Sequence, residues 1–133
     1  MALKDKRQTA KNRHLGQAVG HALQGIEDVI TSERNMRFHL TSAVLVVLAG
    51  GLLKVSCLDW LWLVTAIVAV LAAEMLNTIT EWLCDLVVGS RFDPLVKKIK
   101  DAAAGMVILV AFLALIIGLI IFVPALLKFL KEF

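Results

Sequence analysis

Three side chains that can do chemistry, Glu74, Asn77 and Glu81, follow one another at intervals of three and four residues in a strongly apolar stretch. At about 100° per residue, this spacing places them on one helix face together with Thr78 and Asp85. The opposite face is apolar and suits lipid or packed helices (Met75, Leu76, Ile79, Trp82, Leu83, Leu86 and Val87). Carboxylates at membrane depth cost about 3 kcal/mol each on insertion scales, so two on one face favour a functional site. The alternative is that they lie in headgroup water or pair with basic residues of a neighbouring helix.

Phosphoryl transfer is the chemistry that such a set of residues favours. Hard cations such as Mg²⁺ take carboxylate oxygens together with substrate phosphates. A lysine and a metal ion neutralise the developing charge, while one carboxylate accepts a hydroxyl proton. A proton-coupled transporter also uses carboxylates inside the membrane, but more often near the midplane. The predicted position at the cytosolic edge favours chemistry that draws on a cytosolic nucleotide.

The composition is that of a small integral membrane protein. The chain has 133 residues, of which 59% are hydrophobic and 19% charged, and its mean hydropathy is +0.83. The net charge of +3 does not indicate nucleic-acid binding, because the basic residues cluster beside apolar segments, where they act as topology signals and headgroup contacts. The P-loop pattern is absent, and His14, His21 and His39 are too scattered to form a metal motif.

Periodicity predicts an all-α protein with one domain, residues 1–133. An amphipathic surface helix is expected at about residues 8–32, because its apolar residues recur at helical spacing behind a basic start. Transmembrane helices are expected at about 38–56, 58–88 and 98–127, the first of them short unless it extends into its flanks. The basic residues place the N-terminus and the loop before the last helix in the cytosol. This topology brings Glu33, the polar face of the second span and Lys100-Asp101 to one membrane surface.

These residues resemble the motifs of the prokaryotic diacylglycerol kinase family over nearly the whole chain. The resemblance rests on three motifs: Glu33 with Asn35 and Arg37; Glu74-x-x-Asn77-x-x-x-Glu81 followed by Asp85; and Lys100-Asp101-x-Ala103-Ala104-Gly105. It implies an N-terminal surface helix, three transmembrane helices per subunit, a homotrimer with composite sites between subunits, and Mg-ATP as phosphoryl donor. It also implies a multi-pass protein of the bacterial inner membrane.

The resemblance implies roles for the residues of the second motif and for Glu33. Glu74 would be the general base that activates the lipid hydroxyl, and Asn77 would orient the reacting groups. Glu33 and Glu81 would be the Mg²⁺ ligands that hold the ATP phosphates.

The resemblance also implies a set of nucleotide contacts. Lys100 and Asp101 would contact the nucleotide, with Lys100 near its phosphates. The family uses an arginine near the start of the surface helix, which is assigned here to Arg13, although one alignment places His14 beside it. His21 or Leu23 stands where some members have an aromatic residue.

Undecaprenol is the lipid that the resemblance favours. The Arg34-Asn35 pair, the loop at residues 93–98 and the Lys-Asp-Ala-Ala-Ala-Gly run are similar to the Gram-positive branch, whose members phosphorylate undecaprenol to the carrier lipid of cell-wall precursors. Diacylglycerol presents a similar hydroxyl and is the alternative, with phosphatidic acid as product. An alternative of another class is a non-enzymatic three-helix membrane subunit whose acidic face pairs with Arg91, Lys97 or Lys100.

Overall fold

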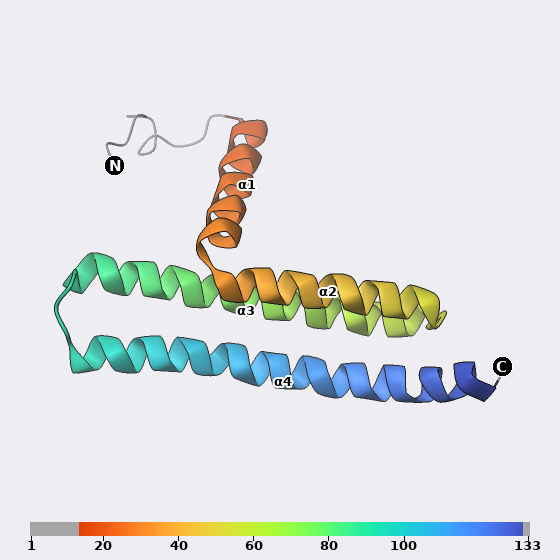
Figure 1. Ribbon diagram of the computed structural model, residues 1–133. Coiled ribbons are helices and arrows are strands. Elements are labelled where there is room, and N and C mark those ends of the chain that lie inside the picture. The colour runs from red at the N-terminus through yellow and green to blue at the C-terminus, as the bar shows by residue number, and fades with distance from the viewer. Residues whose placement is uncertain (1–13, 132–133) are drawn as a thin grey trace.

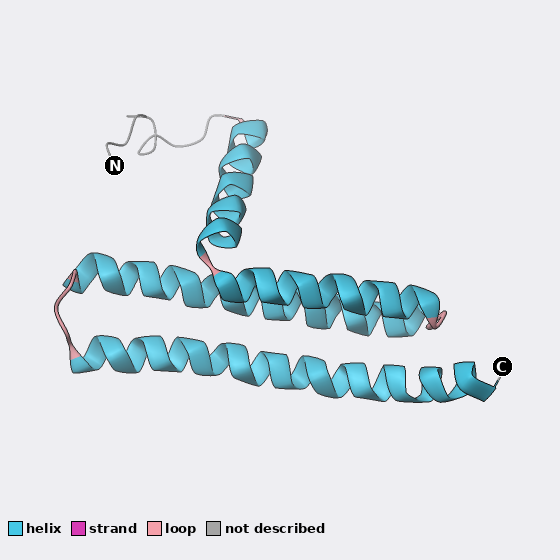
Figure 2. Cartoon of the chain, in the orientation of Figure 1, coloured by secondary structure: helices cyan, strands magenta, loops and turns pink. Residues whose placement is uncertain are grey.

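The computed structural model describes residues 14–131, which form four helices (Figure 1). Within that range the chain is helical apart from short connections, and it contains no strand (Figure 2). Three of the helices are long and apolar enough to cross a membrane, which confirms the predicted all-α architecture. The helices are α1 (Leu15–Ser32), α2 (Arg34–Leu52), α3 (Cys57–Val88) and α4 (Pro94–Lys131).

The break between α1 and α2 is a single extended residue, Glu33, with φ −101° and ψ 120°. The backbone N–H of Glu33 still donates to Val29 O, at 2.9 Å, so the last turn of α1 is closed. Arg37 then reaches back and donates from Nη1 to the carbonyls of Ile30 and Thr31, at 3.1 and 2.9 Å. A cation at a helix C-terminus satisfies carbonyls that have no partner within the helix. This contact fixes α1 across the direction of the other helices (Figure 1).

The first transmembrane helix is shifted from its predicted bounds of about 38–56, because α2 begins at Arg34 and ends at Leu52. Its start lies earlier because Arg37 finds acceptors on α1, so the charged flank continues the helix. Its end lies earlier because the chain turns through Lys54, whose φ is +50°, into a capping box. In that box Ser56 and Asp59 bond each other's backbone N–H groups, which starts α3 at Cys57.

The last helix is longer than the predicted 98–127 at both ends. Asp93 Oδ1 accepts hydrogen bonds from the backbone N–H groups of Leu95 and Val96, at 2.7 and 3.3 Å, and Pro94 occupies the first helical position. Both features favour a helix start at this point rather than at residue 98. The apolar run then continues through Pro124 to Lys131.

The most extensive helix packing in the fold involves α3, which lies against both α2 and α4 (Figure 1). At Gly50 of α2, an added Cβ would lie 2.9 Å from the indole ring of Trp60, so the absence of a side chain there allows the close approach of α2 to α3. On the other side, α3 ends at Gly89, whose φ of +60° suits glycine, and Lys100 of α4 reaches back to Asp85. Two local contacts therefore fix the placement of α3 against its neighbours.

Burial in this chain is the reverse of that in a water-soluble protein. Large apolar side chains are exposed along α2, α3 and α4, as lipid-facing or partner-facing helices require. The buried side chains include three polar ones on α3: Glu74, Asn77 and Thr78, with exposed fractions of 1%, 6% and 0%. The polar face of α3 therefore points into the protein, and it is the place to look for a site.

Candidate active site

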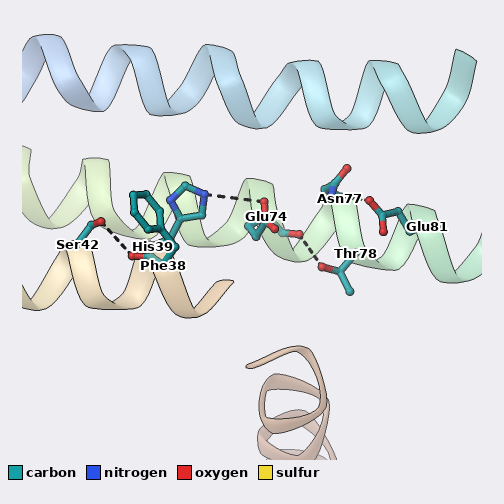
Figure 3. Close-up of polar contacts among 7 residues, drawn as sticks. All are labelled: Phe38, His39, Ser42, Glu74, Asn77, Thr78 and Glu81. Atoms are coloured by element: carbon teal, nitrogen blue, oxygen red, sulfur yellow. Dashed lines mark hydrogen bonds and ion pairs between the residues drawn. The ribbon is translucent and has the colours of Figure 1, made fainter. Parts of the chain in front are cut away.

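The polar residues of α3 share one face, as their spacing predicts (Figure 3). Asn77 Nδ2 donates to Glu81 Oε1 at 3.1 Å, and Thr78 Oγ1 donates to the Glu74 carbonyl at 3.1 Å. Apolar residues on the back of the same helix are exposed, among them Leu76 and Trp82. The helix therefore keeps its polar groups inside and presents its apolar face to the surroundings.

Glu74 is the most unusual of these residues, because its side chain is only 2% exposed. One carboxylate oxygen, Oε2, lies 4.0 Å from Nε2 of His39 on α2 (Figure 3). The other, Oε1, makes no hydrogen bond of normal geometry among residues 14–131, although the Asn35 amide is close enough to act on this carboxylate, and Oδ1 of Asn77 is also unpaired. A buried polar atom without a partner costs about 1–3 kcal/mol, so each such atom needs an explanation, of which binding a substrate is one. A free carboxylate oxygen inside the fold is suited to accept the hydrogen of a substrate hydroxyl group.

Two further carboxylates lie near Glu74. Glu81 is half-buried one turn past Asn77, and Glu33 is half-buried at the break between α1 and α2. Both are close enough for their negative charges to act on Glu74. The structure thus brings together four of the predicted site residues, Glu33, Glu74, Asn77 and Glu81, from two places in the sequence.

A magnesium ion fits this donor set if phosphates complete its coordination. In the described part of the chain, no group of three or more histidine, cysteine, aspartate and glutamate side chains is placed to hold a metal by itself. Mg²⁺ is commonly bound through one or two carboxylates plus substrate phosphates, rather than by a cage made only of protein. Carboxylate oxygens of Glu33 and Glu81 are ligands of the type that this ion prefers.

The residues predicted to contact a nucleotide lie at the start of α4 and are held in ion pairs. Lys100 Nζ is 2.6 Å from Asp85 Oδ1, one turn beyond Glu81 on α3, and the charge of Glu81 also acts on Lys100. Asp101 is exposed and pairs instead with Lys97 on its own helix. Lys100 therefore lies next to the carboxylates at the end of α3, whereas Asp101 turns toward its own helix. The remaining predicted contact, Arg13, lies outside the described residues.

His39 is the member of the site that the sequence analysis missed. No other potential metal ligand is near His39 in sequence, so ligand spacing alone does not single it out. A usable signal was present nonetheless, because an ionisable side chain inside an apolar span is rare and usually marks a functional position. The structure shows that its neighbour across the helix interface is Glu74.

An apolar groove of about 460 Å³ runs between α2, α3 and α4. His39 is one of its few polar lining residues, so the groove meets the carboxylate site at this side chain. The rest of the lining is dominated by aliphatic and aromatic side chains, including Val46, Leu63, Val70, Leu115 and Phe122. An elongated apolar group lying in it would have its polar end near Glu74.

Comparison with known proteins gives consistent matches over most of the chain. Residues 20–122 match the family model described as prokaryotic diacylglycerol kinase. The chain is 40% identical over 106 residues to an undecaprenol kinase of Bacillus subtilis, a match that covers 80% of this chain and 85% of that protein. It is 35% identical over 108 residues to a diacylglycerol kinase of Synechocystis sp., covering 81% of this chain and 62% of the relative.

Proposed function

Because the chain belongs to the prokaryotic diacylglycerol kinase family, we propose that it is a lipid kinase that transfers the γ-phosphoryl group of ATP to a membrane lipid. The observation that carries this proposal is the buried carboxylate of Glu74, which has an unpaired oxygen beside other carboxylates and an apolar groove. A general base must lie within reach of the proton that it takes, in a place that a lipid hydroxyl can enter.

In this proposal the lipid hydroxyl oxygen attacks the γ-phosphorus while its proton passes to Oε1 of Glu74. The bond from the γ-phosphorus to the bridging oxygen breaks, and ADP leaves. Asn77 is held by its hydrogen bond to Glu81 on the same helix face as Glu74, where it would orient the reacting groups. Glu33 and Glu81 would hold Mg²⁺, which would neutralise phosphate charge.

Lys100 supplies a further positive charge for the nucleotide phosphates in this scheme. It must exchange its partner Asp85 for a phosphate oxygen, or bridge the two. Arg13 and Asp101 remain proposed nucleotide contacts on the ground of the motif resemblance alone.

Undecaprenol is the proposed acceptor. The Bacillus subtilis relative is named as an undecaprenol kinase, and it is 40% identical, compared with 35% for the Synechocystis diacylglycerol kinase. The part of a polyprenol chain next to its hydroxyl would lie in the apolar groove beside Glu74. Diacylglycerol is the second candidate, since its free hydroxyl could reach Glu74 in the same way.

The proposed setting is a homotrimer in the bacterial inner membrane with its N-terminus in the cytosol. The distribution of lysine and arginine supports this orientation, which places Glu74 and Glu81 near the cytosolic edge, within reach of ATP. Exposed apolar side chains on all three long helices leave ample surface for subunit contacts, so residues of one site can come from two chains.

One contact favours the alternative of a non-enzymatic subunit. Lys100 of α4 pairs with Asp85 of the acidic face, as that alternative predicts. Glu74 has no such lysine or arginine partner in the described contacts, and the basic side chain that faces it is His39. A pairing role therefore accounts for Asp85 but leaves Glu74 and Asn77 unexplained.

The proposal is tested by incubating detergent-purified protein with γ-labelled ATP, Mg²⁺ and either undecaprenol or diacylglycerol. Label that enters the lipid fraction only when Mg²⁺ and a lipid acceptor are both present supports a lipid kinase. Folded protein that labels neither lipid contradicts the proposal and favours the non-enzymatic subunit.

A further inference from the structure

The pair formed by His39 and Glu74 joins two helices inside the apolar part of the fold. The two side chains are 17% and 2% exposed, and His39 Nε2 lies 4.0 Å from Glu74 Oε2 (Figure 3). The ring of Phe38 stands edge-on beside the imidazole, with ring centroids 5.8 Å apart and an interplanar angle of 70°. The imidazole of His39 therefore has the Phe38 ring beside it and the Glu74 carboxylate facing its Nε2 atom.

The two oxygens of the Glu74 carboxylate have different surroundings. Oε2 faces the imidazole, whereas Oε1 is buried and makes no hydrogen bond of normal geometry within residues 14–131; the Asn35 amide is the other polar group near this carboxylate. A buried carboxylate is unfavourable without a donor, so the oxygen that faces His39 is the one suited to be held. The other oxygen is then left to act on a substrate.

An imidazole can hold Oε2 in either of two protonation states. Nε2 carries a hydrogen in the Nε2–H neutral tautomer and also in the cation, so it can donate in both. The distance of 4.0 Å is too long for a hydrogen bond as it stands. Hydrogen bonds around catalytic groups are often long without substrate and shorten in the substrate complex.

We propose that His39 is a positioning residue that holds Oε2 of Glu74 and so directs Oε1 toward the hydroxyl group of the lipid. The inference rests on the proposed function, because it assigns the orientation of the base in that reaction. His39 itself exchanges no proton with the substrate. Its place in the groove lining also puts it at the point where the polar end of the lipid would meet Glu74.

Replacement of His39 separates positioning from packing. His39→Leu removes the donor and should lower kcat by about tenfold to a hundredfold, because misplacing a catalytic group by about 1 Å costs up to that much. The KM for Mg-ATP should change less than about twofold, since Glu33 and Glu81 are untouched. His39→Gln places an amide N–H near the position of Nε2 and should restore most of the lost kcat. The asparagine of His39→Asn is also polar but too short to reach Glu74, so this variant should not restore the lost kcat.

Thr41 provides the matched control on the same helix. Its hydroxyl group donates to the Arg37 carbonyl at 2.9 Å, and its side chain is exposed. Thr41→Val should therefore keep the wild-type kcat. If His39→Leu is as active as Thr41→Val, or if the Gln and Asn variants have equal kcat values, His39 does not position Glu74. The comparison of Gln with Asn decides the question even if the Leu variant does not fold.

A double-variant experiment tests whether His39 acts through Glu74. In the background of Glu74→Gln, the His39→Leu change should cause no further loss of rate, because there is no base left to position. An equal fold-loss in both backgrounds would overturn the proposed role. Wild-type protein that labels neither lipid would overturn the proposed function and this role together, whereas an active wild type with an unaffected His39→Leu variant would overturn this role alone.

Discussion

Replacing Glu74 with glutamine separates its chemical role from its structural one. Glutamine has nearly the same size and shape, so it fits a site where the residue is 1% exposed. The change replaces the basic carboxylate with a neutral amide that does not take up the proton, and loss of a general base costs about 100-fold or more in turnover. That corresponds to roughly 2.7 kcal/mol of transition-state stabilisation at 1.36 kcal/mol per tenfold change.

The same change should have little effect on folding. His39 lies 4.0 Å away and is partly exposed, so the amide leaves no fully buried cation behind. The free energy of unfolding should therefore change by less than about 1 kcal/mol, and oligomer formation should match that of the wild type.

The assay is labelled-phosphate transfer to lipid, with size-exclusion chromatography and thermal melting in detergent measured on the same preparation. Thr80→Val is a suitable control, since the Thr80 hydroxyl bonds only the Leu76 carbonyl among the contacts described, away from the polar face. A Glu74→Gln protein with wild-type turnover would refute the assignment of the base. A variant that fails to assemble would instead favour a structural role for this carboxylate.

Two other changes test the metal ligands and the helix packing. Glu33→Ala or Glu81→Ala should raise the Mg²⁺ concentration needed for half-maximal rate and lower turnover by about tenfold or more, because each change removes an anchor for the phosphates. An Mg²⁺ titration that matches the wild type would exclude that residue as a ligand. Gly50→Ala should destabilise the protein by about 1–3 kcal/mol relative to Gly51→Ala, because only at residue 50 would the new methyl group lie 2.9 Å from the Trp60 indole ring. Thermal melting measures the difference. Equal melting temperatures for the two variants would show that α2 and α3 do not pack as described.

The polar face of α3 could be predicted from sequence because it depends on one helix alone. Once residues 74–85 are helical, the spacing fixes which side chains share a face, and burial of Glu74, Asn77 and Thr78 agrees with that prediction. The number of membrane-spanning helices was predictable for the same reason, since it follows from the length and hydropathy of continuous segments.

Contacts between helices could not be predicted in this way. The approach of His39 to Glu74 depends on the register of α2 against α3, which the Gly50 contact and the capped turn at Ser56 determine. Periodicity within each helix contains no information on that register. The early start of α2 likewise depends on a contact of Arg37 with another helix, so composition alone placed it too late.

Direct competition between two lipids tests the central claim that this chain is a lipid kinase with undecaprenol as its acceptor. Undecaprenol and diacylglycerol would be offered together in mixed micelles at equal mole fraction, with γ-labelled ATP and Mg²⁺, and the two labelled products would be separated. We expect undecaprenyl phosphate to dominate by about tenfold or more, which requires a difference of roughly 1.4 kcal/mol in transition-state stabilisation. Phosphatidic acid as the main product would contradict the choice of acceptor, and the absence of both products from folded protein would contradict the kinase activity itself.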